Sequence, residues 1–413
     1  MHILLVHQAF VALDQAGGTR HHELARYLAE KSQRVTGIAS PVSYLTGATL
    51  PSNPSNPSSP STSDMDLEGI NVIRTHTYRS LHKSFAQRLI IFISFMADSF
   101  FTGLGVRNVD LVWGTSPPIF QGVSAWLLAR LKRVPFLFEV RDLWPQFAIA
   151  VGVLKNPILI KLSLWLEKFL YRRAERVLVN SPGYVAHVKE NGAVNVEVVP
   201  NGSDPQMFDP GNDGRAFRSA NHLEEKFVVL YAGAHGLSND LGIALEAAKI
   251  LHQTKVTVEV RIVFLGDGKE KMALQEQAAR LELNNVLFLP PVPKNGMADA
   301  LAGADACLAI LKPLEEFKTT YPNKVFDYMA AGRPVVLAID GVIREVVETA
   351  GCGVFVQPGN PGALAEAIEA LAADPGQSRR MGLAGRKTLE EHFSRDRTAE
   401  RMLNILNDMT HPK

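Results

Sequence analysis

Short runs of Val, Ile and Leu alternate with longer amphipathic segments along the whole chain. In the first half we predict strands at Ile3–His7, Val35–Ala39, Val72–Arg74, Leu111–Trp113, Phe136–Val140, Val177–Val179 and Val196–Val199. In the second half we predict them at Val228–Tyr231, Val258–Phe264, Val286–Leu289, Ala306–Ile310, Val335–Ala338 and Gly353–Val356. Nearly continuous apolar strands between helices indicate parallel sheets covered on both faces. Because the pattern occurs twice, the sequence predicts an α/β fold with two Rossmann-like, doubly wound domains.

The domain boundary is predicted at a cluster of turn-forming residues, Pro200–Pro205. We expect an N-terminal domain over residues 1–200 and a C-terminal domain over residues 201–396. A final helix over residues 397–413 is expected to return to the first domain. The Pro- and Ser-rich stretch Pro51–Pro60 is typical of a low-complexity loop.

Composition favours a globular protein of the cytoplasm. The chain is 46% hydrophobic and 21% charged, which does not fit a disordered chain. Only two cysteines occur, Cys307 and Cys352, so neither a disulfide framework nor a metal-ligand spacing is predicted. The most hydrophobic window, Leu89–Val106, contains Asp98, and an ionised carboxylate at mid-bilayer is costly. We therefore expect no spanning helix there.

A glycine pair follows the first predicted strand. Gly17 and Gly18 precede a helix that starts near Arg20. Glycines at this position let backbone N–H groups approach a phosphate at the helix N-terminus. Glycine is equally common in an ordinary turn, so a purely structural role stays open.

The second half repeats this arrangement after two of its strands. The loop after Val228–Tyr231 offers the candidate phosphate ligands Gly233, His235, Gly236 and Asn239. Gly266 and Asp267 end the strand Val258–Phe264, at the sheet edge where such folds bind ligands. A solvated histidine in a glycine-rich loop is the alternative interpretation of His235.

The most informative segment is Tyr321–Val335. Pro322 suits a helix start and Gly332 a helix end. A helix N-terminus favours anions, and Lys324 would add a cation on its first turn, beside Asn323. Asp327 lies three residues further on the same face, where its carboxylate can bind two ribose hydroxyls. An ordinary Lys–Asp helix pair is the structural alternative.

The first half also carries charges at a strand end. Glu139, Arg141 and Asp142 lie at the carboxyl end of the predicted strand Phe136–Val140, close to Trp144. Charges beside a large aromatic side chain are costly unless they are paired or used. They are candidate catalytic residues, with a structural Arg–Asp pair as the alternative.

With these residues in view, the chain resembles glycosyltransferase family 4. It is most similar to the branch that builds bacterial O-antigen, capsule and exopolysaccharide units, which includes N-acetylfucosamine transferases. The resemblance rests on Gln15–Arg20, Phe138–Pro145, Val151–Pro157, Pro200–Asp204, Gly233–Gly236 and Pro322–Pro334. It implies the GT-B fold, with two Rossmann-like domains facing each other across a cleft.

The resemblance also implies an activity. A sugar would pass from a nucleotide diphosphate donor, UDP-linked and carrying an N-acetylated deoxyhexose or hexosamine, with retention of configuration. No metal and no cofactor is expected, and no nucleic acid as partner. The first domain would bind a polyprenyl-diphosphate-linked glycan acceptor and the second the nucleotide sugar. Among side chains near the acceptor, Glu139 and Asp142 are the best candidate bases, while His235 could donate to the leaving oxygen.

The chain departs from the wider family at three places. Thr319 stands where the first Glu of a Glu-x7-Glu motif is usual, and Asp327 takes the place of the second. Ala234, His235 and Asn239 occupy a loop that usually offers an Arg and a Lys, and Lys324 is a plausible replacement cation. Arg141 stands where many relatives have a histidine.

Two other functions remain open from these departures. A sugar-nucleotide epimerase on the same fold would need bases that converge on the donor sugar alone. A non-catalytic membrane-docking subunit of a two-chain transferase would explain the missing Glu at Thr319, although it would not need both phosphate loops. The pair Asp64 and Asp66 resembles a metal motif of another fold, but its context, just after a Pro- and Ser-rich loop, argues against that function.

Charge suggests a membrane partner for the first half. Residues 1–200 hold 20 Lys and Arg against 14 Asp and Glu, whereas residues 201–413 hold 23 against 28. The apolar segment Leu89–Met96 follows the basic residues Arg79, His82, Lys83 and Arg88, and further basic residues recur at Arg130, Lys132, Arg133, Arg172 and Arg173. We predict peripheral docking on the anionic inner face of the cytoplasmic membrane. The alternative is that Leu89–Met96 is a core helix.

Overall fold

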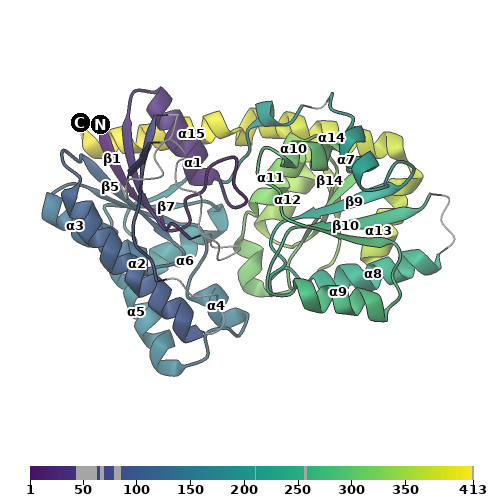
Figure 1. The fold of residues 1–413 in the computed structure, drawn as a ribbon, viewed down its shortest axis with the longest axis horizontal. Coiled ribbons are helices and arrows are strands. Elements are labelled where there is room, and N and C mark those ends of the chain that lie inside the picture. The colour runs from purple at the N-terminus through teal and green to yellow at the C-terminus, as the bar shows by residue number, and fades with distance from the viewer. Residues whose placement is uncertain (43–62, 66–68, 79–84, 210, 255–257, 412–413) are drawn as a thin grey trace, which may run out of the picture. The chain divides into compact units, whose positions relative to one another are not determined.

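The computed structural model describes the chain except for residues 43–62, 66–68, 79–84, 210, 255–257 and 412–413. The described chain divides into two compact units (Figure 1). Unit 1 contains Met1–Ala12, Gly17–Pro200 and Thr398–Lys413, and unit 2 contains Leu13–Ala16 and Asn201–Arg397. The sequence did not predict that Leu13–Ala16 groups with unit 2. None of the described helices is both long and apolar enough to cross a membrane.

Unit 1 is built on one mostly parallel sheet. In its described residues the sheet has eight strands in the order β3-β4-β2-β1-β5-β6-β7-β8. Their bounds are β1 (His2–Val6), β2 (Arg34–Ala39), β3 (Ser63–Met65), β4 (Ile70–Arg74), β5 (Leu111–Ser116), β6 (Phe136–Val140), β7 (Arg176–Val179) and β8 (Val196–Val198). The strand order reverses between β1 and β5, which makes their carboxyl ends the switch point of the sheet.

Helices cover both faces of this sheet. They are α1 (Arg20–Glu30), α2 (Phe85–Gly105), α3 (Phe120–Lys132), α4 (Gln146–Ala150), α5 (Pro157–Arg173), α6 (Val185–Glu190) and α15 (Arg395–Thr410). One core cluster joins the sheet to α2, α3 and α5 through Phe95, Leu128 and Leu170. A second cluster on the other face joins it to α1 through Leu24 and to α15 through Met402.

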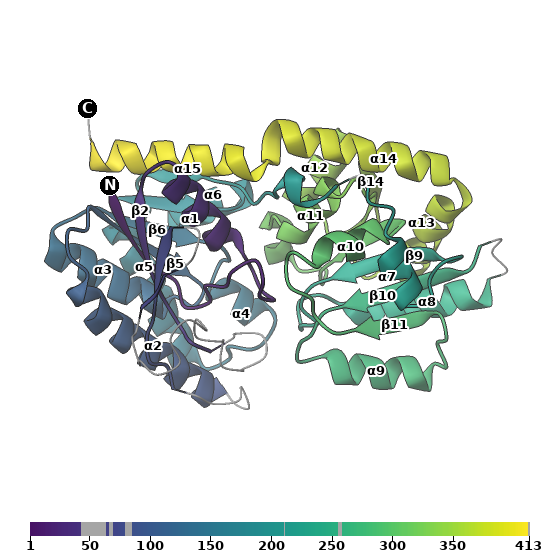
Figure 2. The same cartoon turned by 45° about the horizontal axis from the view of Figure 1, so that its top comes forward.

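The C-terminal helix α15 contributes its apolar face to unit 1. Ala399, Met402 and Leu406 are buried in the same cluster as Ile3 and Leu5 of β1. Figures 1 and 2 both show α15 running alongside α1. Burial of these apolar side chains holds the sixteen-residue helix α15 against β1.

Unit 2 repeats the layered arrangement. Among its described residues the sheet has six parallel strands in the order β11-β10-β9-β12-β13-β14. The strands are β9 (Phe227–Ala232), β10 (Val260–Leu265), β11 (Val286–Leu289), β12 (Ala306–Ile310), β13 (Val335–Ala338) and β14 (Gly353–Phe355). The helices are α7 (Arg215–Ala220), α8 (Leu241–Gln253), α9 (Lys271–Arg280), α10 (Met297–Ala302), α11 (Asn323–Ala330), α12 (Val342–Ala350), α13 (Pro361–Ala373) and α14 (Pro375–Thr388). The switch point lies between β9 and β12.

Each predicted strand overlaps an observed strand, and the α/β fold with two parallel sheets is confirmed. Strand β3 was not predicted. It is short and polar, and it pairs antiparallel with β4 at the sheet edge, so it has no apolar run to signal it. Asp64 of the discounted acidic pair lies in β3, whereas Asp66 lies outside the described residues.

Candidate functional site

Several residues of the site predicted in the second half lie near the switch point of the unit 2 sheet. The loop after β9, the loop after β10 and the N-terminus of α11 are bonded or packed against one another there. The Gly233 N–H donates to the Leu265 carbonyl at 3.0 Å, and the His235 N–H donates to the Asp267 carbonyl at 2.8 Å. We call Gly233, His235, Gly266 and Lys324 the α11 site.

Glycine is required where these loops cross. Gly266 has φ +150°, and a Cβ there would collide with the Gly233 carbonyl oxygen. Gly268 has φ +158°, and its Cβ would collide with the backbone of His235. Gly236 is different, because the nearest atom to its Cβ would be Asn239 Nδ2 at 3.6 Å. The first two glycines therefore serve close backbone packing, which keeps N–H groups at the carboxyl ends of the strands.

Lys324 is a buried cation at the start of α11. Its Nζ is buried and, within the described part of the chain, has no hydrogen-bond partner. It lies 3.8 Å from the centroid of the Tyr231 ring. Burial lowers the pKa of Lys324 from 10.5 to about 7. A Cβ on Gly233 would lie 3.1 Å from Nζ, so the glycine leaves room directly over the amine.

His235 is fully buried, contrary to the alternative of a solvated loop histidine. Neither ring nitrogen has a partner among the residues described. Burial lowers its pKa to about 4, and the charges of Lys271 and Lys324 act in the same direction. The ring is therefore neutral at pH 7, with one N–H able to donate. Its neighbours include the rings of Tyr231, Phe264 and Phe288.

Asp327 is already engaged by three side chains. Its Oδ1 accepts from Ser203 Oγ at 2.6 Å and lies 2.6 Å from Lys294 Nζ, and its Oδ2 accepts from Asn323 Nδ2 at 3.3 Å. Lys294 was not predicted as a site residue, because it lies in the loop after β11 and no motif marks it. The pair is largely buried, with side chains 9% and 14% exposed.

The other predicted ligands of unit 2 have local roles. Asn239 Nδ2 donates to the Ala234 carbonyl at 3.0 Å, and Asp267 Oδ1 accepts from the Gly268 N–H at 2.8 Å. Both bonds shape the loops themselves. Pro322 precedes the first helical residue of α11, as its fixed φ allows. Tyr328 ties the helix to the sheet, since its hydroxyl accepts from the Ala232 N–H at 3.0 Å.

In unit 1, the glycine pair lies at the switch point between β1 and β5. Gly17 and Gly18 are exposed and precede α1, whose N-cap residue is Thr19. Gly17 has φ +153°, and a Cβ there would lie 2.9 Å from Val11 Cγ2. Exposed backbone in front of a helix N-terminus is the kind of segment that can approach a phosphate.

Glu139 is fully buried and held from three sides. It accepts from Arg20 Nε at 2.9 Å, His21 Nε2 at 2.8 Å and Trp113 Nε1 at 3.1 Å. Burial would raise the pKa of Glu139, but the interactions with His21 and Arg20 outweigh it and hold the pKa well below its usual range. A carboxylate so stabilised is a poor base, and this geometry suits a positioning residue better than a catalytic one.

The same network contains a histidine that the sequence analysis did not single out. The His7 ring lies 3.9 Å from the His21 ring, centroid to centroid, and His7 Nδ1 bonds to Thr115 Oγ1 at 2.9 Å. His7 Nε2 is buried without a partner among the described residues. Burial, chiefly, holds the pKa of His7 well below its usual range. Only the position of His7 directly after β1 could have pointed to it.

Arg141 and Asp142 follow β6 in the same region. Arg141 donates through Nη2 to the Pro117 carbonyl at 3.0 Å. Burial raises the pKa of Asp142 to about 6, against the opposing charge of Arg141. A carboxylate that titrates near neutral pH can accept a proton and release it again, which Glu139 cannot.

The segment Leu89–Met96 is partly core and partly exposed. Ile91 and Phe95 are buried, whereas Ile90 is 50% and Ile93 44% exposed. The helix α2 thus packs through one face only. Arg79, His82 and Lys83 of the predicted docking surface lie outside the described residues, and the side chain of Arg88 is likewise not described.

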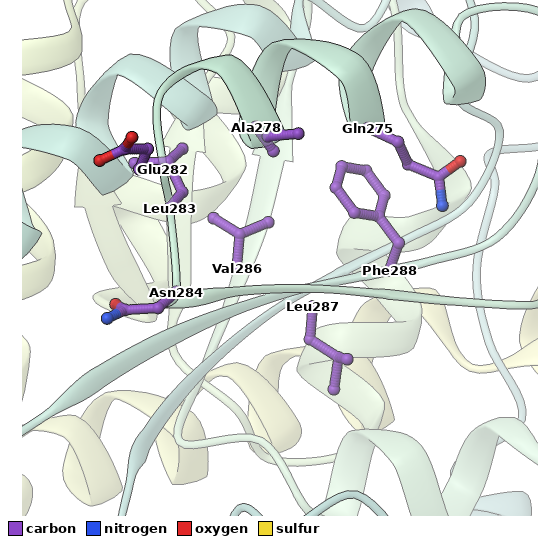
Figure 3. A pocket seen from close by; sticks show the side chains of 9 residues that line it. Gln275, Ala278, Glu282, Leu283, Asn284, Val286, Leu287 and Phe288 are labelled. Carbon is purple, nitrogen blue, oxygen red and sulfur yellow. The ribbon is translucent and has the colours of Figure 1, made fainter.

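A separate depression of about 500 Å³ lies on unit 2 between α9 and β11 (Figure 3). Gln275, Ala278, Val286 and Phe288 are among the side chains around it. None of the predicted site residues lines it. In the described chain no group of three or more His, Cys, Asp or Glu side chains could hold a metal ion.

Comparison with known proteins gives two family models. The model described as "Glycosyl transferase 4-like domain" matches residues 16–202, and "Glycosyl transferases group 1" matches residues 226–374. A D-inositol 3-phosphate glycosyltransferase of Nocardia farcinica is 24% identical over 64% of this chain and 59% of its own. Overall, the chain spans between 52% and 59% of the length of the first curated relatives it matches.

Two solved structures share the whole fold. Sucrose-phosphate synthase from Thermosynechococcus elongatus matches with a TM-score of 0.79 at 18% identity, over 100% of both chains. Anabaena Alr3699/HepE in complex with UDP-glucose matches with a TM-score of 0.73 at 18% identity, over 99% of this chain and 100% of that one. These likenesses show the GT-B fold.

Proposed function

Because the chain belongs to the group 1 and 4-like glycosyltransferases, we propose that it transfers a sugar from a nucleotide diphosphate donor to a lipid-linked glycan. The transfer retains configuration and needs no metal. We assign donor binding to the α11 site in unit 2 and acceptor binding to the region of Asp142 in unit 1. The alternatives, an epimerase and a docking subunit, are not favoured by any contact among the described residues.

The observation that carries this proposal is the state of Lys324. An ammonium group taken out of water without a partner is costly, and an anion that binds it recovers that cost. His235 adds an unpartnered ring N–H, and the N-terminus of α11 adds backbone donors with a positive dipole end. A diphosphate supplies enough acceptors for all of these groups. The Anabaena relative was solved with UDP-glucose, which supports UDP as the nucleotide.

The chemistry follows from charge on the leaving group. The bond between the sugar anomeric carbon and the diphosphate oxygen breaks, and a bond to the acceptor oxygen forms on the same face. Lys324 and His235 stabilise the negative charge that develops on the diphosphate. The proton of the acceptor hydroxyl passes to the released diphosphate, with Asp142 as the side chain able to take part. Glu139 acts as a positioning residue for Arg20 and His21.

Asp327 orients the donor through its ribose. Ser203 and Lys294 both bind Oδ1, which leaves Oδ2, bonded only to Asn323 at 3.3 Å, as the better acceptor for a ribose hydroxyl. The donor sugar in our proposal is an N-acetylated deoxyhexose or hexosamine. We place the enzyme in the cytoplasm, on the inner face of the membrane, in bacterial surface polysaccharide synthesis.

Calorimetric titration with uridine, UMP and UDP tests the donor assignment. Affinity should rise with each phosphate, since the α11 site binds the diphosphate, and it should persist in EDTA. Equal affinity for uridine and UDP would overturn the assignment. Turnover of the bound UDP-sugar only in the presence of a lipid-linked acceptor separates a transferase from an epimerase, which converts the donor alone.

A further inference from the structure

The outward side of α5 is apolar although it faces away from the core. Ile158 is 68%, Leu162 56% and Trp165 63% exposed. Their spacing of four and three residues places them on one side of the helix. The buried residues of α5 are Glu167, Leu170 and Tyr171. A surface helix normally carries polar residues on its outer side, so α5 has two apolar sides where one suffices for the fold.

The exposed ionised side chains of α5 itself all have one sign. Within α5, all of which the structure describes, the exposed charged side chains are Lys161, Lys168, Arg172 and Arg173. The single acidic residue, Glu167, is fully buried, where it accepts from the Tyr171 hydroxyl at 3.0 Å. Trp165 stacks on Phe169, with 5.5 Å between ring centroids, which holds its indole at the surface.

Similar exposure continues along the same layer of unit 1. Helix α3 packs between α2 and α5, and Figure 1 shows the three on one side of the sheet. Phe101 of α2 is 68% exposed and Leu131 near the end of α3 is 59% exposed. In the described part of unit 2, the exposed large apolar side chains lie on three different helices, Ile250, Met272 and Leu383.

We propose that α5 is the surface by which this chain docks on an anionic lipid bilayer. Ile158, Leu162 and Trp165 enter the interface between headgroups and acyl chains, and the four basic side chains meet anionic headgroups. An apolar stripe with tryptophan, a basic border and no exposed acid is complementary to such a bilayer. This inference rests on the proposed function, because docking would bring the enzyme to the bilayer that contains the lipid-linked acceptor. It adds α5 to the docking surface predicted at Leu89–Met96.

Co-sedimentation with vesicles tests the surface. Wild-type protein should bind phosphatidylglycerol vesicles at low salt and should bind phosphatidylcholine vesicles far less. Lys161→Glu with Lys168→Glu should weaken binding at least about 30-fold, from about 1 kcal/mol for each basic group lost. Ile158→Ser with Leu162→Ser and Trp165→Ser should weaken it at least about tenfold, through lost apolar burial.

A matched control places one charge reversal and one apolar-to-serine replacement on unit 2. Lys249→Glu with Met272→Ser alters exposed residues there and should leave vesicle binding unchanged. UDP binding and the thermal midpoint, measured on every variant, exclude unfolding as a cause. Trp165 supplies a direct signal, because its emission should shift to the blue on vesicles, and Trp165→Phe should remove that shift.

The outcomes separate this inference from the proposed function. UDP binding without vesicle binding by the wild type refutes the docking surface alone. Vesicle binding without UDP binding leaves the surface in place and refutes the donor assignment. If the wild type self-associates in solution and the triple serine variant does not, α5 is an interface between copies of the chain, and the membrane proposal is wrong.

Discussion

Replacing Lys324 by methionine should stabilise the fold of unit 2 while it weakens donor binding. Burial lowers the pKa of Lys324 from 10.5 to about 7. One pKa unit corresponds to about 1.4 kcal/mol, so the folded state is disfavoured by roughly 4 kcal/mol at pH 7. The Tyr231 ring, 3.8 Å from Nζ, offsets roughly 1 to 2 kcal/mol of this. We expect Lys324→Met to be about 2 to 3 kcal/mol more stable than the wild type.

The pH dependence gives the sign of the effect. Between pH 7 and 10.5 the unfolded chain keeps the Lys324 proton and the folded chain releases it. The unfolded state therefore binds more protons, and wild-type stability rises with pH across this window. The proton-linked penalty on the wild type should fall from roughly 4 kcal/mol at pH 7 to roughly 2 kcal/mol near pH 9. Urea unfolding at both pH values measures it, with Lys249→Met on the exposed face of α8 as the control.

Donor binding should change in the opposite direction. Loss of a charge-assisted contact costs about 1.5 to 3 kcal/mol, so UDP affinity should fall roughly 10- to 100-fold in Lys324→Met. Wild-type affinity should also fall as the pH rises above about 7, because binding requires Lys324 to be protonated. A variant that is less stable than the wild type, or a stability difference that does not depend on pH, would refute this reasoning.

Three further predictions concern single side chains. Asp142→Asn should lower turnover about 10²- to 10⁴-fold, and the wild-type rate should fall as the pH drops below about 6, where the carboxyl is protonated. Lys294→Met should cost about 2 to 4 kcal/mol in urea unfolding, since it leaves the Asp327 carboxylate buried without its cation, and Asp327→Asn on top of it should recover part of that loss. Gly266→Ala should destabilise unit 2 and weaken UDP binding because its Cβ meets backbone, whereas Gly236→Ala should be nearly neutral in thermal unfolding.

The fold was predictable wherever a strand is buried on both faces. Such strands are continuous apolar runs, for example Leu111–Trp113 and Val335–Ala338, and their alternation with helices defines a parallel sheet. Strand β3 was not predictable, because Ser63–Met65 has no apolar run and gains its conformation from pairing with β4. Local signals thus predict the centre of the sheets better than their edges.

Within the candidate site, sequence reasoning identified what is local and missed what is long-range. The segment containing Lys324 combines a helix start and a cation within a few residues, so it could be read directly. Lys294 pairs with Asp327 only because the fold places the loop after β11 beside α11. The position of Glu139 at a strand end suggested a catalytic base. Its contacts with Arg20 and His21, which are distant in sequence, hold it as an anion instead.

Under the proposed function, lysine at position 324 supplies the positive charge that binds the diphosphate at the α11 site. Ala234 and Asn239, in the loop after β9, bond to each other and offer no charge. An arginine remains charged at every physiological pH, so burying it without a partner would burden the fold permanently. A lysine can lose its proton when the site is empty and regain it when a diphosphate arrives. The buried, neutral His235 follows the same logic, because its ring N–H is available to a ligand without a charge that the empty site must accommodate.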